Sequence, residues 1–287
     1  MKDHSKLIGQ VIDQQDTEIS FKDSILYALS LGLSADPKDE KQLKYTYEEN
    51  LETLPGMSMV LAYPGFWISQ PEYEFEWQKV LHAEESFEIH NQIPPKAKLF
   101  GKTTIESIVD RGPEKGCFIY SKKELFLEDR KTLLATVISN TLARGDGGFT
   151  NGNRDQKKPN STLTIPDRKS DIVCDLPTLT QSALIYRLCG DLNPLHADPK
   201  VAKVAGFEGP ILHGRCTMGV AMHAIIKTCC DYDARRLKSM QVRFSAPFMP
   251  GETLRTEIWQ ESNSIFFRAT ALERGVVVLS NGGAQIN

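Results

Sequence analysis

Residues 186–196, YRLCGDLNPLH, gather a carboxylate, an amide and an imidazole within one short span. On an α-helix Asp191 and His196 would lie about 140° apart, and the proline between them disfavours helical geometry. Gly190 permits a sharp turn just before Asp191. We therefore expect a compact loop in which Asp191, Asn193 and His196 face one point and can serve as acid and base.

A short helix is predicted directly after this loop. Asp198 is a good N-cap residue, Pro199 suits the first helical position, and Gly206 provides a stop. With a helical segment also predicted before the loop, at 179–188, the loop should be a rigid platform.

A second feature follows within about 25 residues of the loop's start, where the run GPILHG at 209–214 leads into an apolar segment. The amino end of a helix presents unpaired N–H groups and a positive dipole, which suit an oxyanion. Gly214 would let a carbonyl group approach the backbone closely. Acid, base and oxyanion site therefore occur close together in the sequence.

The same residues also fit plainer interpretations. Asp-x-Asn-Pro is an ordinary turn sequence, and His196 could be a structural histidine with satisfied hydrogen bonds. Asp191, His196, Asp198 and His213 are ligand types that bind metals, but their spacing matches no dedicated metal motif. The residues alone leave the turn and the acid–base loop open, and they favour no metal site.

The segment from about 215 to 230 is apolar around most of its circumference, so it requires burial on nearly all sides. Strand-like runs follow it at 239–244, 253–260, 264–272 and 276–284. The simplest arrangement wraps an antiparallel sheet around the helix, which is an α+β, hot-dog fold.

The N-terminal half shows the same plan, with a predicted helix and four strand-like runs at 24–33, 85–90, 98–110, 117–127 and 132–143. Between the halves, residues 145–161 are dense in Gly, Asn and charge and have no apolar periodicity, which is typical of a flexible connection. We expect an N-terminal repeat at 1–150, a linker at 151–165 and a C-terminal repeat at 166–287.

The chain has 287 residues, with 34 basic and 37 acidic side chains and a formal net charge of −3. This balance provides no large positive field for nucleic acid or an anionic membrane, and no window reaches the about 20 apolar residues of a membrane helix. The N-terminus has no apolar signal segment, the chain does not end in a Ser-Lys-Leu-type peroxisomal signal, and the six cysteines form no CxxC pair. We expect a soluble intracellular protein, with the cytoplasm favoured over the peroxisome.

The run 186–196, continued by AGF at 205–207 and PILHG at 210–214, resembles the signature of the hydratase-2 family. These MaoC-like, (R)-specific enoyl-CoA hydratases include the hydratase unit of peroxisomal multifunctional enzyme type 2. The resemblance reaches the N-terminal half at 27–29, 47–48, 79–84 and 145–149, and it departs at Ala83, where the family usually has Gly. It implies a double hot-dog fold, in which a non-catalytic N-terminal repeat shapes a tunnel for the acyl chain.

The resemblance also implies the reaction, which is hydration of trans-2-enoyl-CoA to (3R)-hydroxyacyl-CoA in fatty acid metabolism. Asp191, Asn193 and His196 would hold one water molecule. His196 would take a proton from it and Asp191 would deliver one to C2, although a coupled pair can exchange these roles. The N–H of Gly214 would hold the enolate oxygen. Because acid, base and oxyanion site are sufficient, we expect no metal or other cofactor.

The candidate substrate-binding residues are Tyr27, Glu48, Tyr186, His213 and Arg243. Tyr27 and Glu48 match family positions, and Tyr186 could face the site or only pack. Arg243 is one of several basic residues that could meet the CoA phosphates. A homodimer is expected from the family. Two other functions remain open, a hot-dog acyl-CoA thioesterase and a non-catalytic acyl-thioester-binding protein. A thioesterase usually relies on a lone carboxylate and water, so the intact Asp-Asn-His triplet favours the hydratase.

Overall fold

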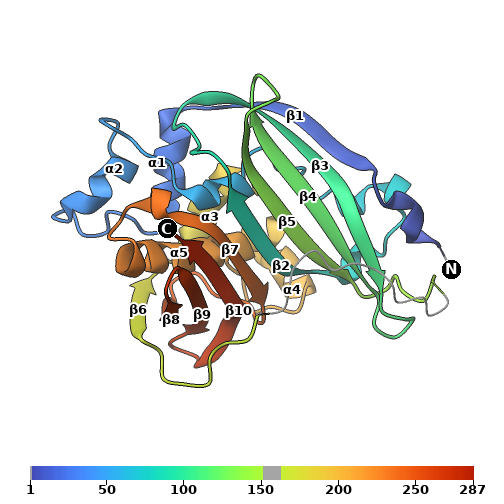
Figure 1. The fold of residues 1–287 in the computed structure, drawn as a ribbon. Helices are drawn as coiled ribbons and strands as arrows, with labels where there is room; N and C mark the ends of the chain where they lie inside the picture. The colour runs from blue at the N-terminus through green and yellow to red at the C-terminus, as the bar shows by residue number, and fades with distance from the viewer. Residues whose placement is uncertain (1, 151–162) are drawn as a thin grey trace.

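The computed structural model describes residues 2–150 and 163–287, and its strands form one antiparallel sheet of ten strands (Figure 1). The strand order is β1-β3-β4-β5-β2-β7-β10-β9-β8-β6, so each half of the chain contributes five neighbouring strands. The strands are β1 (Val11–Ile19), β2 (Val80–Ile89), β3 (Ala97–Asp110), β4 (Cys117–Leu127), β5 (Leu133–Ala143), β6 (Ile172–Pro177), β7 (Leu237–Phe244), β8 (Thr253–Glu261), β9 (Ser264–Ala271) and β10 (Val276–Ile286). The helices are α1 (Phe21–Ser30), α2 (Leu43–Thr46), α3 (Ser182–Tyr186), α4 (Pro199–Val204) and α5 (Gly214–Cys229).

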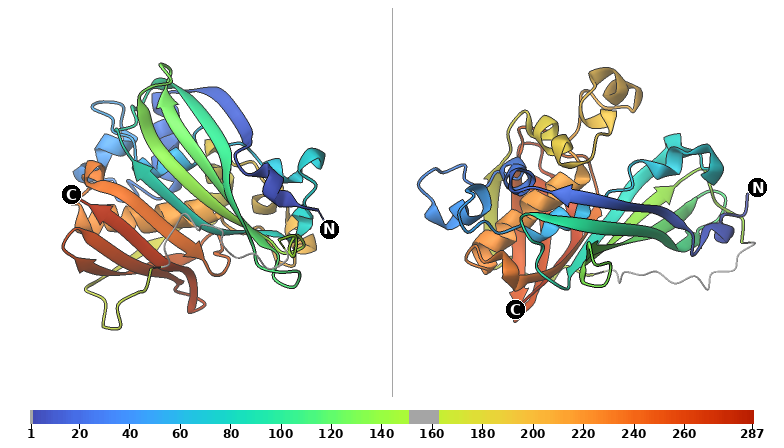
Figure 2. Two further views of the ribbon diagram at one scale, coloured as in Figure 1. Left: turned by 45° about the vertical axis from the view of Figure 1, so that its right-hand side comes forward. Right: turned by 90° about the horizontal axis from the view of Figure 1, so that it is seen from above.

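The two halves are joined by antiparallel pairing of β2 with β7, from Glu84 opposite Arg243 to Glu88 opposite Ser239. The long strands β3, β4 and β5 extend away from the C-terminal half, so that the sheet forms two arms (Figure 2). The sequence predicted two separate sheets with four strand-like runs each, whereas the strands of the two halves form one continuous sheet.

Helix α5 lies in the concave side of the C-terminal strands and contacts β6, β7 and β8. Its residues from Arg215 to Ile226 are all buried, and Ile225 has no exposed surface. The prediction of a helix buried on nearly all sides is confirmed. Its apolar sequence is explained by this position, since every face meets a strand or a neighbouring helix.

The N-terminal half covers its sheet differently. In place of a long helix, the short 3₁₀ turn η3 (Pro55–Met59) contacts β2 and β5, and all of its residues are buried. The helix α1 is only ten residues long and packs mainly against α2 and α3. The expectation that each sheet wraps around its own helix therefore holds only for the C-terminal half.

Three local predictions need correction. The sequence reading missed the strands β1 and β6, and the helix expected at 179–188 is only α3 followed by a 3₁₀ turn at Arg187–Cys189. Residues 145–150 are not a flexible connection, because Asp110 accepts hydrogen bonds from the backbone N–H groups of Gly148 and Thr150 at 2.7 and 2.8 Å. The rest of that predicted connection falls largely at 151–162, outside the described residues.

Candidate active site

The loop between α3 and α4 is shaped by its own turn residues. Gly190 has a φ of +132°, and a Cβ there would lie 3.2 Å from the carbonyl oxygen of Val60. Asn193 caps the 3₁₀ turn at Pro194–His196, because its side-chain oxygen accepts the N–H of Leu195 at 3.0 Å. These turns direct the chain back on itself, as the spacing of the sequence predicted.

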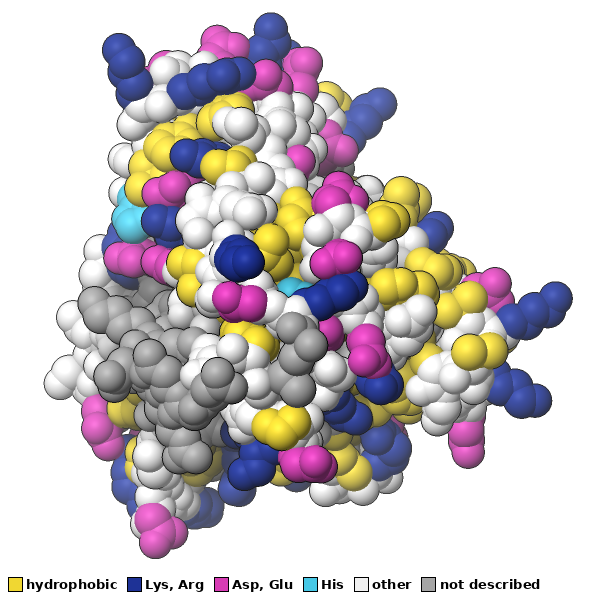
Figure 3. Space-filling view, turned by 90° about the vertical axis from the view of Figure 1, so that its right-hand side faces the viewer, with side chains coloured by type: hydrophobic (Ala, Val, Ile, Leu, Met, Phe, Trp, Pro, Cys, Tyr) yellow, Lys and Arg dark blue, Asp and Glu magenta, His cyan; other side chains and the backbone are white. Residues whose placement is uncertain are grey.

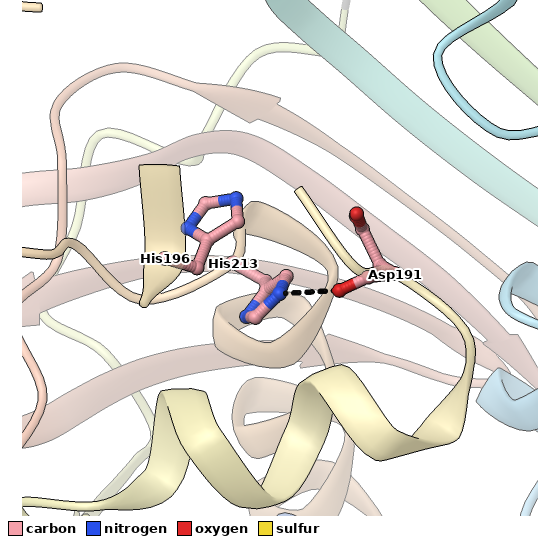
Figure 4. A group of neighbouring side chains, drawn as sticks. All are labelled: Asp191, His196 and His213. Atoms are coloured by element: carbon pink, nitrogen blue, oxygen red, sulfur yellow. Dashed lines mark hydrogen bonds between the residues drawn. The ribbon is translucent and has the colours of Figure 1, made fainter. Parts of the chain in front are cut away.

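The loop brings Asp191 and His196 together with His213, which directly precedes α5 (Figure 4). One polar atom from each of the three side chains lies within 4.8 Å of the others. The two imidazole rings are stacked, with centroids 3.7 Å apart and an interplanar angle of 29°. Asp191 is partly exposed, whereas both histidines are buried.

The hydrogen bond of His196 fixes which ring nitrogen can act as a base. Its Nδ1 lies 2.8 Å from the carbonyl oxygen of Ile211. Because a carbonyl only accepts, Nδ1 must carry the hydrogen, and Nε2 of the neutral ring keeps its lone pair. Burial lowers the pKa of His196 below its ordinary value of 6.5, which favours that neutral ring. His196 is therefore arranged as a proton acceptor.

In His213 the other ring nitrogen, Nε2, carries the hydrogen. Its Nε2 donates to the backbone carbonyl of Asp191 at 3.1 Å, and its buried Nδ1 has no hydrogen-bond partner in the part of the chain that the structure describes. Burial and the neighbouring His196 lower the pKa of His213 to about 4. A neutral His213 thus fixes the position of Asp191 and supports the His196 ring.

The three clustered residues do not fit a shared metal ion. A metal bound to an imidazole lies in the ring plane, about 2.0–2.1 Å from the nitrogen. The rings of His196 and His213 are stacked 3.7 Å apart with a tilt of only 29°, so their planes do not meet that close to both nitrogens. Asp198, the fourth candidate ligand, instead caps α4 by accepting the N–H of Lys200 at 2.8 Å.

The amino end of α5 forms the third part of the site. No side chain caps this end, so the N–H groups of its first turn are available to a ligand. A Cβ on Gly214 would lie only 3.1 Å from the ring of Phe244. A glycine here keeps room at the N–H group that the sequence assigned to an oxyanion.

Of the other predicted residues, Asn193 lies in the loop, Tyr27 and Tyr186 are buried, and Glu48 is exposed. The side-chain oxygen of Asn193 is used as a cap, but its amide nitrogen donates to no described residue and remains available to water. Tyr27 and Tyr186 are fully buried, with Tyr186 packed 5.0 Å from the His213 ring, so they support the site from within. Glu48 is exposed after α2 and shares no hydrogen bond or ion pair with the described loop residues.

Two cavities border the site. One of about 380 Å³ opens beside His196 and is lined partly by Leu184 and Met249. The other, of about 360 Å³, lies where β2 and β7 separate, and its lining includes Arg111, Arg243 and Phe244. Phe244 also lies against Gly214, so this residue contacts both the second cavity and the amino end of α5.

Sequence reasoning missed a buried ion pair beside this end of α5. Nε of Arg215 donates to Glu85 of β2 at 3.1 Å, and both side chains are buried. The guanidinium also lies 4.4 Å from the centre of the Tyr63 ring. One signal was available, because Arg215 is a charge in the first turn of a helix that is apolar around most of its circumference, and a buried charge requires a partner.

Comparison with known proteins places the two halves in related families. Residues 18–145 match the MFE-2 hydratase 2 N-terminal domain, and residues 161–281 match the MaoC like domain. The chain is 34% identical to the peroxisomal enoyl-CoA hydratase 2 of Arabidopsis thaliana, over 90% of this chain and 87% of that protein. It is 35% identical to a probable enoyl-CoA hydratase 2 of Dictyostelium discoideum, over 99% and 96%. The chain belongs to the enoyl-CoA hydratase 2 family.

The family also includes larger proteins. The chain is 35% identical to peroxisomal multifunctional enzyme type 2 of Mus musculus, but it spans 37% of that enzyme's length. Among solved structures, a MaoC-like dehydratase from Phytophthora capsici has 32% identity and a TM-score of 0.86, covering 100% of this chain and 98% of its own. A Mycobacterium tuberculosis protein described as a double hot-dog fold has a TM-score of 0.58, and the predicted fold is confirmed.

The surface agrees with the charge balance of the sequence. On the face shown in Figure 3, Lys and Arg side chains are interspersed with Asp and Glu side chains. Within the described residues, no helix has the length and apolar character needed to cross a membrane.

Proposed function

We propose that this hydratase-2 family chain catalyses (3R)-specific hydration of trans-2-enoyl-CoA to (3R)-hydroxyacyl-CoA in fatty acid metabolism. The observation that carries the proposal is the free Nε2 lone pair of His196 beside Asp191, next to the open amino end of α5. The (3R) configuration rests on the family resemblance. The further activities of longer multifunctional relatives are not assigned to this chain.

In the proposed mechanism, one water molecule donates its two hydrogens to Nε2 of His196 and a carboxyl oxygen of Asp191. Its oxygen is then free to attack C3, while the Asn193 amide orients it. In this division of roles Asp191 starts in its protonated form, so that its carbonyl oxygen accepts from the water while its other oxygen holds a proton. His196 takes a proton from the water as the O–C3 bond forms, and Asp191 releases its own proton to C2. The proton on His196 then passes to the Asp191 carboxylate, which restores both groups. The two residues act as a coupled pair, so these two roles can be exchanged.

The electrons that leave the double bond need a place on the thioester oxygen. The N–H of Gly214 would hold this developing oxyanion, a contribution of about 3 kcal/mol for one such donor. Because the N–H is part of a helix that is fixed on all sides, it requires no reorganisation when the charge develops.

We propose that the CoA phosphates lie in the cavity that contains Arg111 and Arg243. Arg243 is exposed there, and Phe244 both lines that cavity and lies beside Gly214. Glu84 also lines the cavity, so the two arginines must outweigh one carboxylate. Tyr27, Glu48, Tyr186 and His213 remain proposed substrate-binding residues, and His213 has the best support because it contacts the loop directly.

The decisive experiment is an assay of the purified protein with crotonyl-CoA, following loss of the conjugated double bond, with the product configuration determined by chiral chromatography. The proposal expects (3R)-3-hydroxybutyryl-CoA and no free CoA thiol. Release of the thiol without hydration would identify a thioesterase instead. Tight binding without turnover would identify a non-catalytic acyl-thioester-binding protein.

Four further expectations remain proposals. We expect a homodimer, to be tested by light scattering, and repeats at 1–150 and 166–287 with a linker at 151–165, the first repeat shaping the acyl tunnel. We expect no cofactor, so exhaustive chelation should leave turnover unchanged. An intracellular location, with the cytoplasm favoured, agrees with the finding that all six cysteines are free thiols.

A further inference from the structure

Arg215 occupies an unusual place for a cation. It lies in the first turn of α5, where the helix dipole is positive and a carboxylate would be favoured. Only 7% of its surface is exposed, so water does little to offset that cost. A buried charge at the wrong end of a helix is stabilised only by strong partners nearby.

Those partners come mainly from the other half of the chain. Glu85 of β2 accepts from Nε of Arg215 at 3.1 Å and from its Nη2 at 3.5 Å, and Ser139 of β5 accepts from Nη2 at 3.1 Å. Nε2 of His82 lies 2.6 Å from Oε2 of Glu85. Although burial alone would raise the pKa of Glu85, Arg215 and His82 hold that pKa to about 2. The ion pair therefore persists at every pH at which the protein would work.

We infer that the Arg215–Glu85 pair is a positioning pair, by which the N-terminal half fixes the amino end of α5 and with it the groups that act on the substrate. The inference rests on the proposed function. Arg215 is one residue from Gly214 and two from His213, whose Nε2 holds the Asp191 carbonyl and whose ring supports His196.

The position of the Gly214 N–H relative to the substrate oxygen determines its effect on the rate. A displacement of about 1 Å at a reacting group can cost on the order of a hundredfold in rate. The Gly214 N–H meets its oxyanion only as charge develops, so a small shift of the first turn of α5 should lower kcat and leave KM largely unchanged. A pair that only stabilised the fold would affect the melting temperature instead.

The test is the double variant Glu85→Gln with Arg215→Met, which removes both charges together. Replacing both partners of a buried ion pair often leaves stability nearly unchanged, whereas removing one partner strands the other. We expect a melting temperature close to that of the wild type, a kcat for crotonyl-CoA lowered about 10- to 100-fold, and a KM within about twofold. The control is Glu257→Gln with Arg268→Met, a more exposed arginine–glutamate pair across β8 and β9, which should retain full turnover.

Each outcome decides the inference. A folded double variant with wild-type kcat overturns it, and so does a variant in which only KM rises, since that would make the pair a substrate contact. If the double variant does not fold, Arg215→Lys keeps the charge but loses the forked geometry, and full kcat in that variant equally overturns the inference. Wild-type turnover is measured alongside, so failure of the hydratase proposal itself is recognised separately.

Discussion

Each half of the sheet has a concave apolar face, and a different kind of element covers it in each half. The C-terminal half uses α5, which satisfies its own backbone hydrogen bonds apart from its ends. The N-terminal half uses η3 and the residues just after it, whose carbonyl groups do not all find backbone partners. Lys123 of β4 extends inward and donates to the carbonyls of Met59 at 3.1 Å and Leu61 at 2.6 Å.

This difference decides where chemistry can occur. A helix that begins inside the molecule offers free N–H groups at its amino end, and the loop that carries Asp191 and His196 folds beside that end. In the N-terminal half, the corresponding cover is a turn whose free groups are carbonyls, and a buried lysine uses them. The half without a long helix contacts the site through Val60, which lies against Gly190, and through Glu85, which accepts from Arg215.

The largest expected effect tests the burial of α5. Ile225→Asp places an unpaired charge on a side chain with no exposed surface, at a cost of about 3–5 kcal/mol or more, which would unfold a protein of ordinary stability. Val204→Asp, on the 91% exposed end of α4, is the control and should change stability by less than about 0.5 kcal/mol. A thermal melt in which both variants behave like the wild type would contradict the buried helix.

The second-largest expected effect tests whether catalysis depends on residues of the C-terminal half. Asp191→Asn and His196→Gln nearly preserve shape, so each should remain folded while turnover of crotonyl-CoA falls about 10²- to 10⁴-fold. The double variant should lose little more, because groups that act as a unit are not additive. His90→Gln, on an exposed histidine of the N-terminal half, should keep normal turnover. Near wild-type rates in both single variants would reduce the loop to an ordinary turn.

A smaller effect tests the hydrogen bonds from Lys123 to the turn η3 and the residues just after it. Lys123→Met leaves the carbonyls of Met59 and Leu61 without their donor, which should cost about 1–3 kcal/mol of unfolding free energy. The neighbouring Lys122→Met, on the outer face of β4, is the matched control and should be nearly neutral. Equal denaturation midpoints for the two variants would show that the turn does not depend on the lysine.

Lys123 should also give the stability a pH dependence. Burial, and then Arg215, lower its pKa from 10.5 to about 7, so between these values the unfolded chain binds the proton that the folded chain has lost. Stability of the wild type relative to Lys123→Met should therefore rise with pH across that window, by at most about 1.4 kcal/mol per pH unit. Denaturant melts at pH 7, 8 and 9 would measure it, and a constant difference between the proteins would contradict it.

The smallest effect concerns the pH profile of turnover. Because burial lowers the pKa of His196 below 6.5, the neutral ring that accepts a proton persists to lower pH than in a free histidine. The acid limb of kcat should therefore lie below pH 6.5. A limb at or above that value would mean that another group controls the rate.

Periodicity in the sequence was sufficient for most of the fold. The predicted strand at 117–127 coincides with β4, and the predicted helix at 215–230 differs from α5 by one residue at each end. The missed strands β1 and β6 are the two outer strands of the described sheet. β1 has one buried residue, and β6 is only six residues long, so each gives a weak apolar pattern in the sequence.

The candidate site was predictable only in part. The loop could be read from the sequence because turn residues and acid–base residues are local. Arg215 and Glu85 are 130 positions apart, and nothing in either segment specifies that β2 will pair beside α5. The role of Lys123 depends likewise on a turn more than 60 positions earlier. Such contacts arise only when segments far apart in the sequence pack together.

That junction, the pairing of β2 with β7, has a consequence for how the chain can be divided. Within the sheet, each of these strands hides the open edge of the other, and only β1 and β6 remain as outer edges. If the chain were cut within 151–165 and the halves were then separated, β7 would be exposed as a row of unpaired N–H and C=O groups, the kind of edge that recruits another strand. The separated C-terminal half should therefore self-associate along β7, replacing its missing neighbour with a second copy of itself.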